Sequence, residues 1–508
     1  MSPLDQTHLG GCAPVQRPSP ARRGAWLGIA VAAVLSGCAV GPDFVRPAPP
    51  AVDRYTSEPL PAATVAADGQ AQRFVPGAAI AADWWRLFKS EPLDAMVRQA
   101  LAHSPTLEAA EASLRESQDN LRAGYGVFFP RIDAGLAGSR ERSAPLQQGL
   151  QTPGSIFNVV TLGGTISYAL DVFGGERRKV EGLRAQTDYQ RYASQAAYLT
   201  LSANVVNASI ARAAYAAQIR ATEEMIVLEQ QQLQSTEAQV RAGTAAYASV
   251  LSLRSLIATN QAALAPLKQK RDQSEHLLAT LQGVLPSQVR LPDIDLGALA
   301  LPADLPVSLP SDLVRQRPDI LQAQAQLHVA SANIGVATAA MFPSFSLGAT
   351  YGATGTSLGN LSAASGRFWS IGPSVSIPLF QGGSLWYGRK AAIDAYQASQ
   401  AGYRQTVLSA FAQVADSLKA LEHDAQALQA QAEAQRAAAE ALQLLHVNYQ
   451  AGMVAYLDVL TADVQFHEAS IAYLQAVAQR QQDTVALFAA LGGGWWNGQN
   501  PLSEGKAP

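Results

Sequence analysis

One residue pattern occurs twice in this chain, and this duplication restricts the possible folds more than any other feature. Seven landmarks recur 213 positions later: Pro105, Ala110, Ala112, Leu114, Asn120, Phe129 and Pro130 return as Pro318, Ala323, Ala325, Leu327, Asn333, Phe342 and Pro343. Seven more recur 209 positions later: Ala242, Gly243, Ala246, Tyr247, Val250, Leu251 and Gly283 return as Ala451, Gly452, Ala455, Tyr456, Val459, Leu460 and Gly492. A period of about 200 residues is far longer than the repeats of solenoid proteins. The sequence therefore predicts two large copies of one structural unit.

The two copies differ in length at one place. Phe173 and Phe380 form a further matching pair, but they are 207 residues apart. A six-residue difference therefore lies between the Phe-Pro landmarks and this phenylalanine. We expect it in exposed hairpin loops, at residues 143–155 and 355–366.

Composition excludes one class of partner and points to another. Of 508 residues, 48% are hydrophobic and only 15% are charged, which is poorer in charge than a typical soluble domain. The net charge of −3 gives no electrostatic case for binding nucleic acid, which normally requires a basic domain. We therefore expect no nucleic-acid partner and a surface that is partly covered by something other than water.

The N-terminus has the parts of an export signal. Arg22 and Arg23 precede an apolar stretch at residues 25–35, which ends in Ser-Gly-Cys at Cys38. This ending resembles the lipobox of bacterial lipoproteins, which implies cleavage before Cys38, a covalent lipid on Cys38 and, with Ala39 next, transfer to the outer membrane. The alternative is an ordinary signal peptide with a chance cysteine. We predict a signal peptide at residues 1–37.

The remaining chain divides into five predicted segments. A Pro-rich stretch at 38–82 reads as an extended, lipid-anchored tether. The first repeat, 83–285, and the second, 312–494, are joined by a Pro-rich connector at 286–311 and followed by a tail at 495–508. Each repeat is predicted as a helix of about 30 residues, two short strands, one very long helix, a turn and a helix of about 40 residues.

The long helices are the clearest predicted elements. Residues 183–242 contain neither Gly nor Pro, and 60 helical residues would form a rod of about 90 Å. In the second repeat apolar residues alternate by four and three, the spacing of a coiled-coil seam. This seam consists of Val407, Phe411, Val414, Leu418, Leu421, Ala425 and Leu428. The sequence therefore predicts rods that pack lengthwise on one another.

Four segments alternate between apolar and small polar residues, as strands do when their two faces differ. The apolar positions are Ile132, Ala134 and Leu136; Val160, Leu162, Ile166, Tyr168 and Leu170; Phe345, Leu347, Ala349 and Tyr351; and Trp369, Ile371, Val375, Ile377 and Leu379. A half-buried sheet of a soluble protein could show the same pattern. Together with the export signal, the pattern favours strands with one face to lipid and one to a water-filled lumen. Pro373 and Pro378 leave the local register open.

Four strands alone cannot cross a membrane, because lipid offers no partner for the backbone groups of two free edges. Closed barrels begin at eight strands, so either two or three copies of the chain would satisfy this requirement. The pore is therefore predicted to belong to an oligomer.

The order of these features resembles the outer-membrane factor family, the TolC-like and OprM-like exit ducts of efflux and secretion systems. The likeness is carried by Cys38 with Gly41-Pro42-Asp43-Phe44, by Asp83-Trp84-Trp85, by the duplicated Phe-Pro and Ala-Gly-x-x-x-Tyr landmarks, and by Leu491-Gly492-Gly493-Gly494-Trp495. It implies an α+β membrane protein and a TolC-like homotrimer. Four strands per chain would form a 12-stranded outer-membrane barrel, which a long periplasmic α-helical barrel continues, with the connector in an equatorial belt.

The resemblance also implies roles for residues at the predicted helical turns. Gly243, Tyr247, Val250, Gly452 and Tyr456 would lie at the periplasmic tip, where the family meets its adaptor. Both glycines also have a plain role, because Gly commonly ends a helix in a left-handed conformation.

Gate residues are implied at the same tip. Asp458 matches an aspartate that lines the closed tip of TolC-like members, and Thr461 stands where that relative has a second aspartate. The alternative for Asp458 is a charge that favours the first turn of a helix.

No pattern for a catalytic site, a metal site or a nucleotide site stands out, so we expect no enzyme activity, no metal and no cofactor besides the lipid. Arg177, Arg178 and Lys179 could meet lipid headgroups or lie in a solvated first turn. The expected function is passive exit through the outer membrane for substrates that an inner-membrane pump and a periplasmic adaptor deliver, for efflux or type I secretion. The alternative is a non-conducting periplasmic coiled-coil lipoprotein with a structural role.

Overall fold

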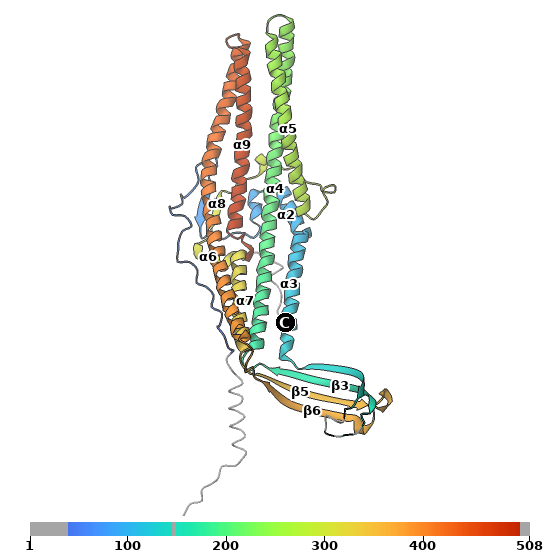
Figure 1. The fold of residues 1–508 in the computed structure, drawn as a ribbon. Helices are drawn as coiled ribbons and strands as arrows, with labels where there is room; N and C mark the ends of the chain where they lie inside the picture. The colour runs from blue at the N-terminus through green and yellow to red at the C-terminus, as the bar shows by residue number, and fades with distance from the viewer. Residues whose placement is uncertain (1–38, 145–148, 150, 152, 498–508) are drawn as a thin grey trace, which may run out of the picture. The chain divides into compact units, whose positions relative to one another are not determined.

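The computed structural model describes residues 39–144, 149, 151 and 153–497 (Figure 1). The chain folds into two compact units. The first comprises residues up to Asp43, Gly124–Glu181 and Ser331–Ile393, and the second comprises Phe44–Ala123, Gly182–Ala330 and Asp394 to the end. The predicted signal peptide and Cys38 lie outside the described residues.

The first unit contains one antiparallel sheet of four strands, in the order β2-β3-β5-β6. The strands are β2 (Arg131–Arg142), β3 (Ile156–Leu170), β5 (Ser344–Gly355) and β6 (Arg367–Ser376). Each repeat supplies one hairpin, and β3 pairs with β5 where the two repeats meet. Strands β2 and β6 are the two edges, so each has an unpaired row of backbone groups.

The register places apolar and polar residues on opposite faces. One row of directly paired residues is Ile132, Ile166, Ala349 and Ile371, and the next row is Asp133, Thr165, Thr350 and Ser370. Directly opposite residues share a face, and successive rows alternate. The predicted alternation is therefore confirmed within all four strands, and it is in phase across the sheet. The prediction was wrong for Ile377 and Leu379, because β6 ends at Ser376, two residues before Pro378.

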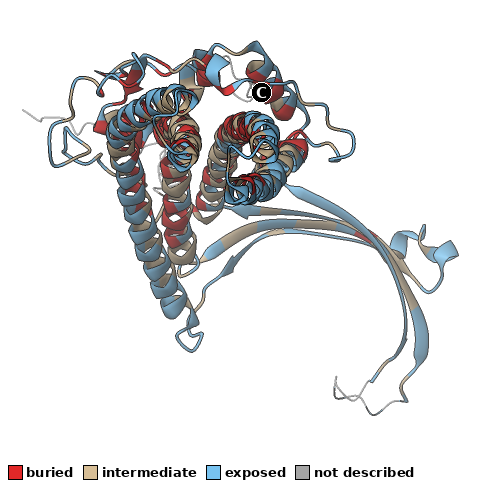
Figure 2. Cartoon of the chain, turned by 90° about the horizontal axis from the view of Figure 1, so that it is seen from above, coloured by how far each residue is buried: buried red, intermediate tan, exposed pale blue. Residues whose placement is uncertain are grey.

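Among the described residues, none buries either face of the sheet as a whole. Figure 2 shows a strongly curved sheet whose residues are mostly exposed or intermediate. The exposed apolar side chains include Ile132, Leu136, Leu162, Ile166, Trp369 and Ile371. Pro373 lies in the edge strand β6, opposite Leu347, where a missing N–H is tolerated, and Pro378 follows the strand.

Two helical hairpins of equal dimensions complete the repeats. They are α4 (Gly175–Arg241) with α5 (Tyr247–Leu281), and α8 (Ser384–Gln450) with α9 (Tyr456–Ala490). Both long helices have 67 residues and both partners have 35, so the long helices extend about 100 Å. The predicted seam of α8 packs inward, with Val414, Leu418 and Leu421 fully buried. Among the described residues, no helix has an apolar stretch long enough to cross a bilayer.

The first helix of each repeat differs from the single helix that the sequence predicted. It is broken into α2 (Glu91–His103) and α3 (Pro105–Gly124), and into α6 (Pro310–Gln316) and α7 (Pro318–Ala339). The residue before a proline avoids the helical region, and proline has no N–H to donate. Ser104 and Arg317, which precede the prolines, both adopt extended conformations.

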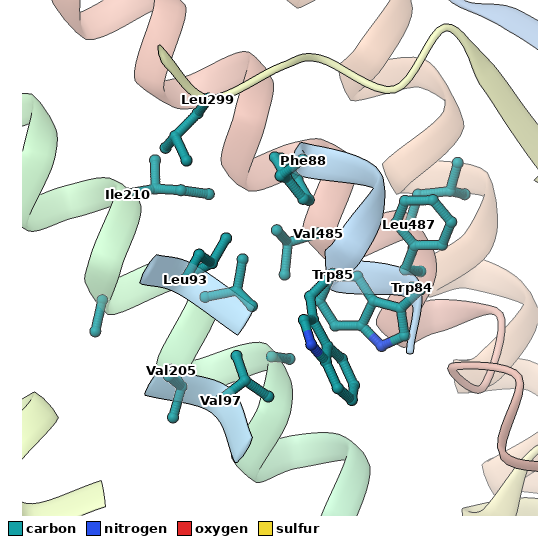
Figure 3. Packing of buried hydrophobic residues seen from close by; sticks show 14 of the residues in the cluster. Trp84, Trp85, Phe88, Leu93, Val97, Val205, Ile210, Leu299, Val485 and Leu487 are labelled. Carbon is teal, nitrogen blue, oxygen red and sulfur yellow. The ribbon is translucent and has the colours of Figure 1, made fainter. Parts of the chain in front are cut away.

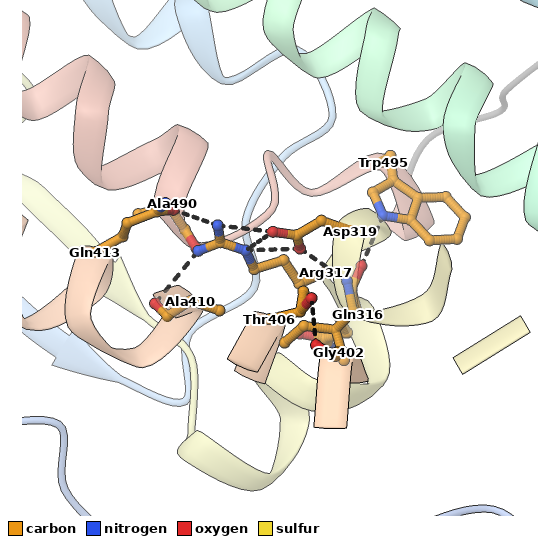
Figure 4. A network of polar contacts seen from close by, with 10 residues as sticks. Gln316, Arg317, Asp319, Gly402, Thr406, Ala410, Gln413, Ala490 and Trp495 are labelled. Carbon is orange, nitrogen blue, oxygen red and sulfur yellow. Dashed lines mark hydrogen bonds and ion pairs between the residues drawn. The ribbon is translucent and has the colours of Figure 1, made fainter. Parts of the chain in front are cut away.

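Arg317 fixes the second break by a buried polar network (Figure 4). Its Nη1 donates to the Ala490 carbonyl oxygen at 2.7 Å, its Nε donates to Asp319 Oδ1 at 2.9 Å, and its Nη2 donates to Gln413. Trp495 Nε1 donates to the Gln316 carbonyl oxygen at 2.8 Å. The break between α6 and α7 is therefore tied to α8 and to the end of α9.

The core of the second unit surrounds the 3-10 helix η1 (Trp84–Phe88). Trp84 stacks on Phe488 with 5.3 Å between ring centroids. Figure 3 shows this cluster closing around Trp84, Trp85 and Phe88, with Leu93, Val97, Val205, Ile210, Leu299, Val485 and Leu487. Side chains from both repeats therefore meet in one core.

The segment predicted as a tether at 38–82 is extended but packed against the protein. Strand β1 (Arg73–Pro76) pairs in parallel with β4 (Asp304–Val307) of the connector. Gln72 is buried and donates to the Pro302 carbonyl oxygen and to Thr484 Oγ1, both at 3.1 Å. The described part of this segment is therefore held to the connector and to α9, because its backbone and polar groups find partners there.

Short 3-10 turns join the remaining elements: η2 (Tyr125–Phe128), η4 (Leu296–Ala298), η5 (Leu358–Asn360), η6 (Ala364–Gly366) and η7 (Trp495–Asn497).

Candidate functional site

The turns at the ends of the two hairpins have the same backbone design. The Gly243 N–H donates to the Val240 carbonyl oxygen at 3.0 Å, and the Thr244 N–H donates to that of Gln239 at 2.9 Å. At the second tip, Gly452 and Met453 make the equivalent bonds to Tyr449 and Asn448. This is the Schellman arrangement, which requires positive φ at the glycine; φ is 76° at Gly243 and 74° at Gly452. Both glycines therefore have the structural role that the sequence predicted.

The other predicted tip residues divide by exposure. Tyr247 is 57% exposed at the start of α5, so it is accessible to a partner. Val250 is 1% exposed and offers no surface to a partner, which differs from its predicted role. Tyr456 is half-buried, with its ring 5.3 Å from that of Tyr449. Burial raises the pKa of the Tyr456 hydroxyl above its usual range, so this group stays protonated.

Asp458 and Thr461 lie on the exposed first turns of α9. Asp458 Oδ2 accepts a hydrogen bond from the Ala455 N–H at 3.0 Å, which satisfies a donor that the helix itself leaves free. Thr461 Oγ1 donates to the Leu457 carbonyl oxygen at 2.9 Å. The helix-capping interpretation of Asp458 is therefore confirmed, and Ser249, its counterpart in the first repeat, makes no such cap.

A polar contact that the sequence did not reveal joins the two hairpins near their tips. Tyr449 Oη, on α8, donates to Gln239 Oε1, on α4, at 3.1 Å. Below it, a cavity of about 290 Å³ is lined by Glu229, His446, Tyr456 and Asp463, among others. Both hairpins contribute to this lining, so any separation of the tips must change it.

Two acidic residues, Glu229 and Asp463, line this cavity. Glu229 is 3% exposed, and its Oε1 accepts from Asn260 Nδ2 at 2.6 Å. Burial, with Asp463 adding to it, raises the pKa of Glu229 to about 7. Burial also raises the pKa of Asp463. The sequence gives no sign that Glu229 and Asp463 lie near each other, because their proximity depends on how the two hairpins pack.

Residues 39–43, which we call the strap, are bound to the first unit. The Val40 N–H donates to the Phe173 carbonyl oxygen at 3.0 Å. The buried Arg178 donates from Nε to the Val40 carbonyl oxygen at 3.3 Å and from Nη2 to Asp43 Oδ1 at 2.7 Å. Its Nη1 donates to Glu181 Oε2 at 2.7 Å. Arg178 therefore holds the strap and is neither solvated nor free for lipid headgroups, which corrects both predicted alternatives for this residue.

Gly41 shows how closely the strap approaches the protein. A Cβ added to it would lie 2.5 Å from the Gly335 Cα, and its φ is 96°. Only glycine fits there, because a side chain would overlap with backbone and strain the conformation. Neighbouring Arg177 and Lys179 pair with Asp171 and Glu176.

Comparison with known proteins agrees with the geometry of the sheet, the hairpins and their tips. The model of the outer membrane efflux protein family matches residues 96–284 and 309–493. The toluene efflux pump outer membrane protein TtgC of Pseudomonas putida is 29% identical over 477 residues, covering 92% of this chain and 96% of TtgC. The cation efflux system protein CusC of Escherichia coli is 27% identical over 468 residues, covering 92% of this chain and 97% of CusC.

A solved structure has the same fold over nearly its whole length. The outer-membrane channel OprN superimposes with a TM-score of 0.81 at 27% identity, covering 90% of this chain and 100% of that of OprN. The two family matches fall in the two repeats, which are the halves that the duplication defined. The chain therefore belongs to the outer membrane efflux protein family, whose members are outer-membrane channels and not enzymes.

Proposed function

We propose that three copies of this chain form one pore through the outer membrane. The observation that carries an oligomeric pore is the sheet, which has an apolar face, a polar face and two unpaired edges. The number three comes from the resemblance to the outer-membrane factor family. Three such sheets close into a 12-stranded barrel with the apolar face toward lipid and the polar face toward a wet lumen. Closure satisfies the backbone groups of β2 and β6, which lipid cannot do.

The helical hairpins continue this pore into the periplasm. Two hairpins per chain give six per trimer, with lengthwise seams of the kind seen in α8. No step of transport is energised by this chain, so an inner-membrane pump supplies the energy and a periplasmic adaptor connects the two. Transport through the chain itself is passive exit. Relatives are named for toluene efflux, cation efflux and pyoverdine export.

The tips are the proposed contact with the adaptor and the proposed gate. Gly243, Tyr247, Gly452 and Tyr456 supply turns and aromatic surface to the adaptor. Asp458 adds three carboxylates per trimer, and like charges that converge on one axis favour a bound or passing cation. The Tyr449–Gln239 hydrogen bond holds the two hairpins together in the closed state.

The membrane anchor is the proposed lipid on Cys38. Only the covalent lipid is expected as a bound group, and no metal or other cofactor has a role in this mechanism. The strap begins one residue after Cys38, and Arg178 holds it beside the turn that follows β3. The first residues after the proposed lipidation site are thereby held close to the end of β3.

Single-channel recording of the purified full-length lipoprotein in planar bilayers tests this function. Wild-type protein is expected to form channels of low conductance that divalent cations reduce further. Asp458→Ala is expected to raise conductance or remove the cation effect, and Glu433→Ala, an exposed acid on the shaft of α8, serves as its control. Trimers that never conduct would contradict the channel and favour the structural lipoprotein. If Asp458→Ala changes neither the conductance nor the cation sensitivity of the channel, the proposed gate is contradicted and the channel is not.

A further inference from the structure

An aromatic cluster in the first unit joins the two repeats of one chain. Phe173, in the turn after β3, stacks on Phe342 with 4.7 Å between ring centroids and 25° between ring planes. Its ring centroid also lies 6.4 Å from that of Phe345. Phe342 and Phe345 flank the start of β5, the strand that pairs with β3. The cluster therefore seals the base of the sheet where the first repeat meets the second.

The duplication supplies a second set of the same residues. Phe380 corresponds to Phe173, whereas Phe129 and Ile132 correspond to Phe342 and Phe345. In the single chain this second set is open: Phe380 is 89% exposed, Phe129 is 69% exposed and Ile132 is 73% exposed. The chain therefore contains both halves of a second apolar contact and completes neither.

The two halves cannot meet inside one chain. Phe380 follows β6 and Phe129 precedes β2, and these strands are the opposite edges of the sheet. Two strands lie between them, so three strand spacings of about 4.8 Å each keep the edges apart. A partner for each half must come from another molecule.

We propose that Phe380 of one copy packs against Phe129 and Ile132 of a second copy of this chain. The contact repeats, across the chain boundary, the one that Phe173 makes with Phe342 and Phe345 within the chain. It also brings β6 beside β2 in the antiparallel sense in which β3 lies beside β5. This inference rests on the proposed oligomeric pore and adds which edges meet and which side chains seal them.

Strand registers support the transfer of this contact between junctions. In the first hairpin Arg131 pairs with Ser167, and in the second Ser344 pairs with Ser376. The repeat offsets of 213 and 207 would place Ser374 opposite Ser344, so the two hairpins differ by two residues. A shift of two leaves every side chain on its face. The apolar residues of β6 therefore lie on the same face of the sheet as those of β2.

Cysteine cross-linking of the full chain in outer membranes tests the proposal. The variant Phe129→Cys/Phe380→Cys, treated with a short bis-maleimide, is expected to run on denaturing gels as covalent dimers and trimers. The matched control Phe173→Cys/Phe342→Cys carries the intrachain contact and is expected to keep the mass of one chain. Either cysteine alone, and the pair Leu136→Cys/Phe380→Cys, should give at least tenfold less cross-linked oligomer, because Leu136 lies further along β2.

A second variant covers the case in which the double cysteine protein does not assemble. A benzophenone amino acid at position 380 keeps an aromatic ring there, and its photoproduct is mapped by mass spectrometry. Cross-links to the peptide containing residues 129–132 of another chain support the proposal. If the wild-type protein is a trimer but the benzophenone at position 380 reacts only with lipid, or with another protein segment, the contact is overturned and the pore is not. A wild-type protein that stays monomeric in the membrane overturns both.

Discussion

Repeat 1 and repeat 2 build the same elements from sequences that share few residues, and their differences are more informative than their likeness. Both have a strand pair, a 67-residue helix, a glycine turn and a 35-residue helix. These shared elements are the ones that every unit would contribute to a closed ring of strands and helices. What they do not share lies at the strap, at the base of the sheet and at the tip.

Each difference identifies a junction with its own task. Arg178 of repeat 1 donates hydrogen bonds to the strap, whereas repeat 2 meets it through the close approach of Gly335 to Gly41. Only repeat 1 has its aromatic residue covered, since Phe173 is packed and Phe380 is exposed. Only repeat 2 has an acid at the tip, Asp458, where repeat 1 has Ser249. In the proposed channel, the elements common to both repeats form the wall of the pore, and the differences between the repeats provide the strap contact, the joint between copies and the gate.

The largest expected effect comes from placing an arginine on the apolar face of the sheet, in the same row of paired residues in each repeat. Ile166→Arg and Ile371→Arg lie in one row of the sheet, and each should cost about 2 to 4 kcal/mol if that row lies near the bilayer midplane. The controls Thr165→Arg and Ser370→Arg occupy the polar row. Urea titration of protein in lipid vesicles measures the cost. Equal losses from both rows would show that the apolar face is not in lipid.

The strap should detach from the first unit when Arg178 is replaced. Arg178→Ala deletes charged hydrogen bonds to residues 39–43, each worth about 1.5 to 3 kcal/mol at most. Hydrogen exchange at Val40 is expected to accelerate at least tenfold. Lys179→Ala, next to it but exposed, is expected to change nothing. Protection that survives Arg178→Ala would mean that the backbone alone holds the strap.

The acid pair between the hairpins predicts a dependence on pH. The pKa of Glu229 is raised to about 7, so the folded protein favours the protonated form more than the unfolded chain does. This contribution is complete below the usual carboxyl pKa and is lost as pH rises through about 7. Between about pH 5 and about pH 8, the melting temperature of Glu229→Gln should therefore fall less than that of the wild type. Glu224→Gln, an exposed neighbour, is the control. If the melting temperature of Glu229→Gln changes with pH as much as that of the wild type, Glu229 is not the source of the pH dependence.

The smallest expected effect is an exchange of tip residues between the repeats. Asp458→Ser removes the cap on Ala455 and should weaken the first turn of α9 by about 0.3 to 1 kcal/mol. Ser249→Asp should strengthen the first turn of α5 by a similar amount. Hydrogen exchange of these two turns reads the change directly. If the exchange rates of neither turn change, then Asp458 does not stabilise α9, and the difference between Asp458 and Ser249 matters only for conduction.

Local sequence patterns were sufficient to predict the elements that depend on local chemistry. Residues 183–242 lack Gly and Pro, and all of them up to Arg241 lie in one helix. Gly243 and Gly452 follow the helix ends with positive φ, as expected. Alternation located all four strands because apolar residues dominate one face over most of their length. The breaks at Pro105 and Pro318 were missed although proline is a local signal. Conversely, the exposed Pro266 lies inside α5 without ending it, so a proline does not mark a helix boundary at every position.

Long-range contacts could not be predicted in the same way. The pairing of β1 with β4 joins residues more than 200 positions apart, and no local pattern indicates it. Arg178 looked like one of three similar cations, and only the folded chain shows that it alone is buried against the strap. Glu229 and Asp463 lie on different hairpins, so their proximity and raised pKa values depend on packing.

Electron cryomicroscopy of the full-length lipoprotein in lipid nanodiscs would test the central claim most directly. The account predicts three copies around one pore, with β6 of each chain hydrogen-bonded to β2 of the next, and with Ile166 and Ile371 facing lipid while Thr165 and Ser370 face water. A structure in which the sheet edges stay open, or in which the apolar faces pack on each other without a lumen, would contradict it.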